Sequence, residues 1–210
     1  MCIRDRNRCV IGGFAYSGQV CIHVQRIYVH KSVFREFFEK FVEKTKKLKI
    51  GNPLDESTEF SSMIDEKNAE RVDLWVTEAV LDGAKIVCGG VNDGSFYPPT
   101  ILINTNKLMK VCALEIFGPV VTLEPIENFE QGVKFINDTQ FGLQAGIFTN
   151  KQNEIKYAFN HIEAGGIIIN DVPTFRVDHM PYGGVKNSGF GREGVKYSIF
   201  EMMEPKLLVL

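Results

Sequence analysis

Apolar residues recur every three to four positions in several stretches of the chain, a spacing typical of amphipathic helices. The clearest case is residues 31–49, where Phe34, Phe37 and Phe41 fall on one face and charged side chains on the other. We expect further helices over 66–82, 129–138 and 151–163, and a short one near 192–200. Asn128, with Gln131 three residues on, is typical of a capping box and predicts where the helix 129–138 begins.

Short apolar runs alternate with these helices and predict strands. We expect the strands at 26–30, 85–88, 100–103, 120–123, 143–148 and 166–170. The run 166–170 is apolar on both faces and lies beyond a helix, which is typical of a parallel sheet covered on both sides. Residues 120–170 therefore predict a β-α-β-α-β unit. The predicted fold class is α/β, a mostly parallel sheet with helices on both faces.

The last five residues, 206–210, are apolar apart from Lys206, which is unusual for an exposed terminus. We expect them to form a strand that pairs with a sheet edge, of this chain or of another subunit.

Composition and charge narrow the class of protein. The 210 residues are 44% hydrophobic and 24% charged, which is ordinary globular composition and excludes intrinsic disorder. The net charge of −2 leaves no basic surplus for a nucleic-acid partner. The apolar runs are too short to span a bilayer and the N-terminus lacks the pattern of a signal peptide, so we expect no membrane partner and a cytoplasmic location.

The cysteines are five in number, widely spaced and without a C-x-x-C pair: Cys2, Cys9, Cys21, Cys88 and Cys112. This spacing argues against a disulfide framework and against a structural metal site. Any chemically special cysteine is then expected to act alone, as a nucleophile.

A possible dinucleotide fingerprint occurs at Gly189-Phe190-Gly191-Arg192-Glu193-Gly194. That motif should follow a strand and be followed by an acidic residue about 20 positions on. Here it follows a polar loop and the chain ends first, so we reject it.

Cys21 lies in Gly18-Gln19-Val20-Cys21, just before the first predicted strand. A glycine allows close backbone approach, and a loop beside a strand can present a nucleophile. Free cysteines more often pack in a core, so local features alone leave these two readings equal. His23 would share a face with Cys21 in a strand, but nothing marks a third group to orient a Cys–His pair, and we disfavour it.

Three motifs taken together favour the interpretation of Cys21 as a nucleophile. Phe14-x-x-x-Gly18-Gln19-x-Cys21, Glu115-Ile116-Phe117-Gly118-Pro119 and Pro181-Tyr182-Gly183-Gly184-Val185-Lys186-Asn187-Ser188-Gly189 resemble, in order and spacing, signatures of the NAD(P)-dependent aldehyde dehydrogenase superfamily. The resemblance extends from about residue 10 to the C-terminus. Residues 168–180 are similar to the lactaldehyde dehydrogenase-like branch.

The resemblance implies roles for particular residues. Cys21 would attack the aldehyde carbonyl, and the resulting thiohemiacetal would pass a hydride to NAD or NADP and leave a thioester for hydrolysis. Glu115 would bind the nicotinamide ribose and Phe117 would pack near the ring. Four residues would contact the substrate aldehyde: Phe14, Phe175, Arg176 and His179. For Arg176 and His179, recognition of a polar or anionic aldehyde and pinning of their own loop are equal readings.

The resemblance also implies an organisation. Residues 10–190 would form the catalytic domain and 191–210 a C-terminal helix and oligomerisation strand of a homo-oligomer. Residues 1–9 do not resemble the family, which leaves open an extraneous start. The coenzyme-binding domain, the oxyanion asparagine and the general-base glutamate have no counterpart here, so we expect the 210-residue chain to be inactive or nearly so alone.

Two other functions stay open at this point. One is a non-catalytic scaffold or interaction module that keeps the fold but does not use Cys21. The other is a cysteine hydrolase that uses Cys21 with His23.

Overall fold

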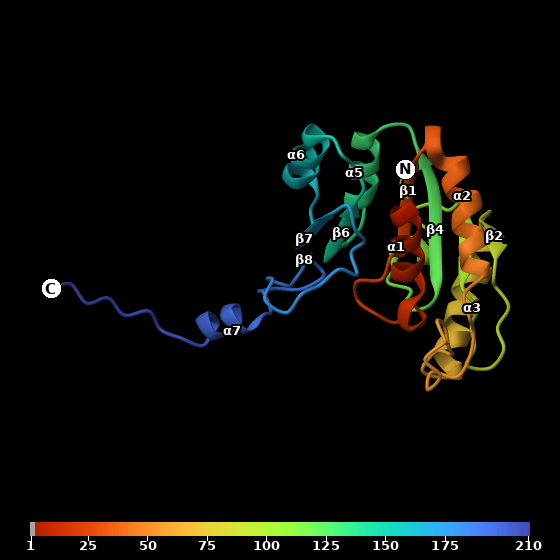
Figure 1. Cartoon of the computed structure of the whole chain (residues 1–210), viewed down its shortest axis with the longest axis horizontal. Coiled ribbons are helices and arrows are strands. Elements are labelled where there is room, and N and C mark those ends of the chain that lie inside the picture. The colour runs from red at the N-terminus through yellow and green to blue at the C-terminus, as the bar shows by residue number, and fades with distance from the viewer. Residues whose placement is uncertain (1–2) are drawn as a thin grey trace.

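The computed structural model describes residues 3–210, as an α/β body from which the C-terminal segment projects (Figure 1). The larger sheet has the strand order β1-β4-β3-β2. Its strands are β1 (Arg26–His30), β2 (Lys85–Cys88), β3 (Thr100–Ile103) and β4 (Val120–Ile126). β4 pairs in parallel with β1 and β3, and β2 is antiparallel to β3. The predicted α/β class with a mostly parallel sheet is confirmed.

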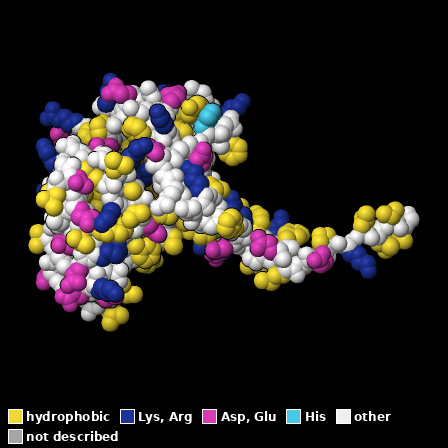
Figure 2. All heavy atoms as spheres, turned by 180° about the vertical axis from the view of Figure 1, so that it is seen from behind, with side chains coloured by type: hydrophobic (Ala, Val, Ile, Leu, Met, Phe, Trp, Pro, Cys, Tyr) yellow, Lys and Arg dark blue, Asp and Glu magenta, His cyan; other side chains and the backbone are white. Residues whose placement is uncertain are grey.

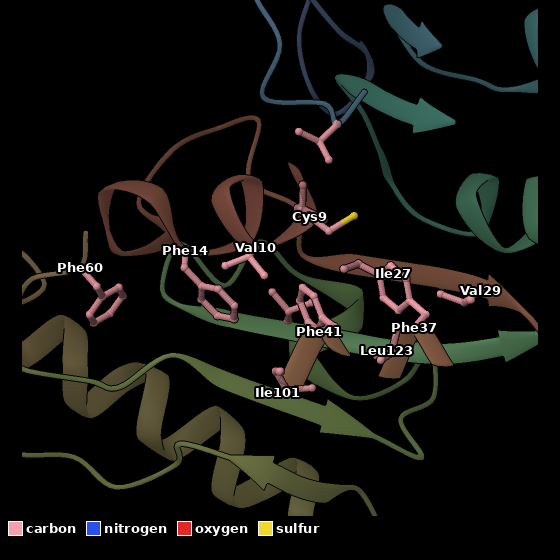
Figure 3. Close-up of a cluster of buried hydrophobic side chains, with 13 residues drawn as sticks. Cys9, Val10, Phe14, Ile27, Val29, Phe37, Phe41, Phe60, Ile101 and Leu123 are labelled. Carbon is pink, nitrogen blue, oxygen red and sulfur yellow. The ribbon is translucent and has the colours of Figure 1, made fainter. Parts of the chain in front are cut away.

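Helices cover both faces of this sheet because alternate residues of β4 point to opposite sides. Val121 and Leu123 join one core cluster with α1 (Ile3–Phe14) and α2 (Lys31–Lys46), as seen around Phe37 and Phe41 in Figure 3. Val120 joins a second cluster with α3 (Glu66–Leu81) and α4 (Lys110–Ala113).

The β-α-β-α-β order is present, but its strands do not form one sheet. After β4 come α5 (Phe129–Asn137), β5 (Phe141–Gly142), β6 (Gln144–Ile147), α6 (Gln152–His161) and β7 (Gly166–Ile169). β6 and β7 are parallel to each other and lie in a separate sheet from β4. β4 is already paired on both sides, by β1 and β3, so it offers no edge to β6. The single-sheet expectation for residues 120–170 was therefore wrong.

The two ends of the chain differ in structure, one helical and the other an exposed segment. α1 begins at Ile3, so residues 3–9, expected to be atypical, share one helix with residues 10–14, and the first two residues of that segment lie outside the described part. Beyond β8 (Val185–Lys186) and α7 (Val195–Glu201), residues 206–210 are exposed and form no strand. A strand needs a partner edge, and this segment projects away from the body (Figure 1).

Within residues 3–210, no helix has the length and apolar character needed to cross a membrane.

Candidate functional site

Cys21 is exposed in the loop between the short 3-10 helix η1 (Ala15–Gly18) and β1. The backbone of this loop is unusual because Tyr16, Ser17 and Gly18 all have positive φ, at 52°, 55° and 68°. A side chain on Gly18 would lie 2.1 Å from the carbonyl oxygen of Gly118. Glycine is therefore required at position 18 for both conformation and space, and the absent side chain lets the Cys21 loop rest on the Glu115–Pro119 motif.

Two side chains fasten the Cys21 loop to residues 61–64. Ser17 Oγ donates to the carbonyl oxygens of Ser61 at 2.7 Å and Ser62 at 3.2 Å. Gln19 Oε1 accepts a hydrogen bond from the backbone N–H of Ile64 at 3.1 Å. The residues around Cys21 are thus engaged in structural contacts, while Cys21 itself stays accessible.

The Glu115–Pro119 motif forms the turn between α4 and β4. Glu115 is exposed, and partial desolvation raises the pKa of its carboxyl group. Phe117 has a φ of 43° and is 39% exposed, while its neighbour Ile116 is fully buried. One short turn therefore presents a carboxylate and an aromatic ring at the surface.

A groove of about 830 Å³ lies beside this turn. Tyr16 and Gln19 from the Cys21 loop contribute to its wall together with Phe117. The other lining residues are Ser17, Pro53, Thr58, Glu59, Phe60, Ser61, Ser62, Ile64 and Asn68. The groove exposes the Phe117 ring, against which a flat ligand can lie.

Tyr182 lies in the third motif, where Arg176 stacks on its ring. Partial burial raises the pKa of the Tyr182 hydroxyl, and the negative charges of the Cys21 thiolate and the Glu115 carboxylate raise it further. Arg176 opposes this rise. Gly18 of the first motif rests against Gly118 and Pro119 of the second, so these two motifs are in contact.

The third motif is folded by close backbone contacts. Tyr182 and Glu193 exchange backbone hydrogen bonds of 3.1 and 2.6 Å. A side chain on Gly183 would lie 2.5 Å from the carbonyl oxygen of Gly191, and Arg192 Nη1 donates to the Gly184 carbonyl oxygen at 3.0 Å. Backbone contacts thus hold the third motif and the residues up to Glu193 together.

The predicted substrate residues divide into two groups. Phe175 is 42% exposed, and Arg176 and His179 are exposed beside the third motif. The Arg176 guanidinium lies over the Tyr182 ring, 4.0 Å from its centroid, and its Nη2 is 3.5 Å from Glu193 Oε2. This contact shows that Arg176 holds its own loop in the structure, which was one of the two readings of this residue.

Phe14 lies elsewhere. It is 1% exposed, and its ring stacks on Phe41 with centroids 6.2 Å apart (Figure 3). The structure gives Phe14 a packing role in the core, because the end of α1 points this side chain inward against α2.

His23 does not pair with Cys21. Its Nε2 donates to the Gly13 carbonyl oxygen at 2.9 Å, and burial lowers the pKa of the imidazole to about 4. The Nδ1 atom is buried and has no hydrogen-bond partner among the described residues. His23 is therefore a neutral structural residue, which removes the support for a Cys–His nucleophile pair.

Sequence reasoning missed Gln25, whose side chain binds the backbone of residues 111–116. It lies at the start of a strand and carries no motif, so no local signal marks it. The contacts of Ser17 could not be predicted from the sequence either, since its partners Ser61 and Ser62 lie more than forty residues away along the chain.

Known proteins similar to this chain agree on one family. The 3-sulfolactaldehyde dehydrogenase of Priestia aryabhattai is 53% identical over 197 residues, which are 94% of this chain and 41% of that protein. The crystal structure of aldehyde dehydrogenase 21 from Physcomitrella patens, in complex with the reaction product succinate, matches 98% of this chain and 43% of that one, with a TM-score of 0.95 and 47% identity. The NADP complex of glyceraldehyde-3-phosphate dehydrogenase GapN from Methanocaldococcus jannaschii matches with a TM-score of 0.91 and 42% identity, over 95% of this chain and 43% of that one.

The chain thus spans less than half the length of these relatives. The 3-sulfolactaldehyde dehydrogenase among them agrees with the lactaldehyde dehydrogenase-like branch expected from residues 168–180. A family model described as the aldehyde dehydrogenase family matches residues 5–208, and the chain therefore belongs to the aldehyde dehydrogenase family.

Proposed function

We propose that this chain carries the nucleophile of an enzyme that oxidises an aldehyde to a carboxylic acid with NAD or NADP. The observation that carries the proposal is the exposed thiol of Cys21 in a loop that rests, at Gly18, on the Glu115–Pro119 motif. Family membership supports the reaction type.

Cys21 is suited to covalent catalysis because sulfur is both a good nucleophile and a good leaving group. The thiolate would attack the carbonyl carbon, a C–S bond would form, and the oxygen would take the electron pair of the C=O bond. Loss of hydride would leave an acyl thioester on Cys21, which water would hydrolyse to the acid. The backbone N–H of Cys21 lies in a loop held by Ser17 and Gln19, so it would be a fixed donor to the developing oxyanion.

Glu115 and Phe117 fit a nicotinamide coenzyme. A carboxylate can accept hydrogen bonds from the two hydroxyls of a ribose, and the exposed Phe117 ring borders the groove where a flat ring can lie against it. When bound, the coenzyme supplies the hydride acceptor. GapN from M. jannaschii, one of the similar structures, is an NADP complex, which supports this assignment.

Phe175, Arg176 and His179 would select the aldehyde. The Arg176 guanidinium favours an anionic substituent, and the His179 imidazole can donate a hydrogen bond to it. The similar proteins support such a substituent, since one is named for 3-sulfolactaldehyde and another binds succinate.

The organisation of the whole protein is part of the same proposal. We place the catalytic domain at 10–190 and an oligomerisation segment at 191–210, with a cytoplasmic homo-oligomer as the assembled form. The support is the row of exposed apolar side chains on the projecting segment (Figure 2), which includes Phe200, Leu207 and Leu210. Since the relatives are more than twice as long, the 210-residue chain alone is expected to form little or no NADH or NADPH.

Protection of Cys21 by aldehydes tests the proposal without coenzyme. The chain is treated with iodoacetamide alone and in the presence of succinic semialdehyde or butanal, and alkylation of each cysteine is measured by peptide mass spectrometry. We expect both aldehydes to slow alkylation of Cys21, through reversible thiohemiacetal formation, and to leave the buried Cys9 unaffected. The carboxylate-bearing aldehyde should protect at lower concentration.

Alkylation of Cys21 that no aldehyde slows would contradict the proposal and favour the scaffold function.

A further inference from the structure

The side chain of Gln25 directs both of its N–H donors and its carbonyl oxygen at one short segment. Its Nε2 donates to the carbonyl oxygens of Val111 at 2.8 Å and Leu114 at 2.7 Å, and its Oε1 accepts from the backbone N–H of Ile116 at 3.0 Å. A primary amide has two N–H donors and one carbonyl, and all are used here.

These bonds reach groups that have no other regular partner. The last carbonyls of a helix lack an intrahelical donor, and Val111 lies within α4, which ends at Ala113. Leu114 has already left the helix, with φ −115° and ψ 164°. Gln25 therefore binds the backbone at the end of α4 and in the turn that follows, where Leu114 and Ile116 flank Glu115.

Gln25 is itself held by the sheet. The main-chain carbonyl oxygen of Gln25 accepts a hydrogen bond from the backbone N–H of Thr122 at 2.8 Å. The pairing of β1 with β4 begins at the next residue, Arg26. Cys21 lies four residues earlier in the same chain segment. The Gln25 amide is thus a bridge from the segment that follows the nucleophile to the segment that carries Glu115.

A second connection lies on the other side of Glu115. Gly18 rests against the backbone of Gly118 and Pro119, at distances that leave no room for a side chain. Glu115 therefore lies between two residues that Gln25 holds, Leu114 and Ile116. Phe117 lies between Ile116 and the contact of Gly118 with Gly18.

We propose that Gln25 is a positioning residue, which fixes the backbone of residues 111–116 and so sets the place of the Glu115 carboxylate relative to Cys21. This rests on the proposed function in one respect, the role of Glu115 as a coenzyme ligand. Gln25 does not line the groove beside Phe117.

The test replaces Gln25 by Met, which has a similar length and no hydrogen-bonding amide, in the 210-residue chain. NMR measures the amide exchange rate of Ile116 and the pKa of the Glu115 carboxyl group. We expect exchange at Ile116 to accelerate about tenfold or more, the ratio that corresponds to about 1.4 kcal/mol, because its N–H loses its acceptor. The pKa of Glu115 should fall toward its ordinary value, because a loosened turn lets water reach the carboxyl group.

Two controls make the result specific. Gln152→Met makes the same change at an exposed position on α6 and should alter neither readout. Val133, in the third core cluster around α5 and α6, reports general loss of stability through its own amide exchange. Gln25→Asn keeps the amide but is one methylene too short to reach all three groups, so it should move both readouts in the same direction as Met.

Unchanged exchange at Ile116 and an unchanged Glu115 pKa in both Gln25 variants would overturn the proposal, as would equal acceleration at Val133. Neither readout uses coenzyme or aldehyde. Failure of aldehydes to protect Cys21 would overturn the proposed function and leave this result standing, and the reverse also holds.

Discussion

The two loops that border the candidate site are held in different ways. The nucleophile loop, residues 14–25, is fixed by backbone fit at Gly18 and by the buried or partly buried contacts of Ser17 and Gln25. The substrate loop, residues 171–182, is anchored at its base, where Asp171 pairs with Arg8 at 2.5 Å, but residues 175–179 are exposed. These exposed residues are held mainly by Arg176, whose guanidinium lies over the Tyr182 ring and pairs with Glu193.

This difference has a chemical meaning. The residues before Cys21 carry backbone strain that the surrounding structure supports, which is consistent with the proposed nucleophile, because a nucleophile must keep its geometry for every substrate. A specificity loop can be held by exposed side-chain contacts of about 1 kcal/mol each, which a ligand can replace.

Gly18→Ala should be the most damaging change in the nucleophile loop. Alanine disfavours a φ of 68°, and its Cβ would stand 2.1 Å from the Gly118 oxygen, so we expect a loss of about 3 to 4 kcal/mol in the free energy of unfolding. Urea unfolding measures it. Gly94→Ala is the matched control, since Gly94 has a φ of 58° with nothing within 4 Å, and it should lose only about 1 to 2 kcal/mol. Equal losses would refute the close fit at Gly18.

Acid should weaken the nucleophile loop through His23. The imidazole has its ordinary pKa of 6.5 in the unfolded chain and about 4 when folded, so the unfolded chain binds the proton first as pH falls. The His23 contribution is complete above pH 6.5 and is lost toward pH 4, by about 3 kcal/mol. Urea unfolding at pH 7 and pH 4 should show this loss of unfolding free energy. In His23→Gln, the loss between the two pH values should be smaller by about 3 kcal/mol. A variant with the same pH dependence would contradict the buried, neutral imidazole.

Ser17→Ala removes the hydroxyl that bonds Ser61 and Ser62 and leaves their carbonyl oxygens without this donor. We expect a loss of about 1 to 2 kcal/mol. Ser57→Ala, in an exposed turn, should stay within about 0.5 kcal/mol of the parent in the same urea titration. If the two variants behave alike, the attachment to residues 61–64 contributes little.

Arg176→Met should change stability by less than about 1 kcal/mol, because it removes only exposed contacts. Its effect should appear in selectivity, as a loss of about tenfold in the preference of Cys21 protection for succinic semialdehyde over butanal. Arg35→Met, which removes an exposed arginine paired with Glu39 on α2, is the control and should keep the preference. An unchanged preference in Arg176→Met would assign Arg176 to loop structure alone.

The sequence predicted well what depends on local periodicity. The helices near 31–49, 66–82 and 151–163 are present within a few residues, and the capping residue Asn128 accepts from the Gln131 backbone N–H at 2.9 Å. Periodicity could not tell which strands pair, because that depends on which edges of β4 remain free.

Motifs mark Cys21 and Glu115 as candidate site residues, and both are exposed in the structure. The sequence could not show that Phe14 faces the core, because burial depends on the packing of α2 against α1. Nor could it reveal Gln25, whose partners lie 86 to 91 residues away along the chain.

Acyl transfer to Cys21 is the most direct test of the central claim, that this thiol forms a thioester in the reaction. The 210-residue chain is mixed with p-nitrophenyl acetate, quenched in acid and mapped by mass spectrometry; transfer would release p-nitrophenolate and leave an acetyl thioester. We predict acetylation of Cys21 ahead of Cys88 and Cys112, and equally in His23→Gln. Acetylation that spares Cys21, or that depends on His23, would contradict the account.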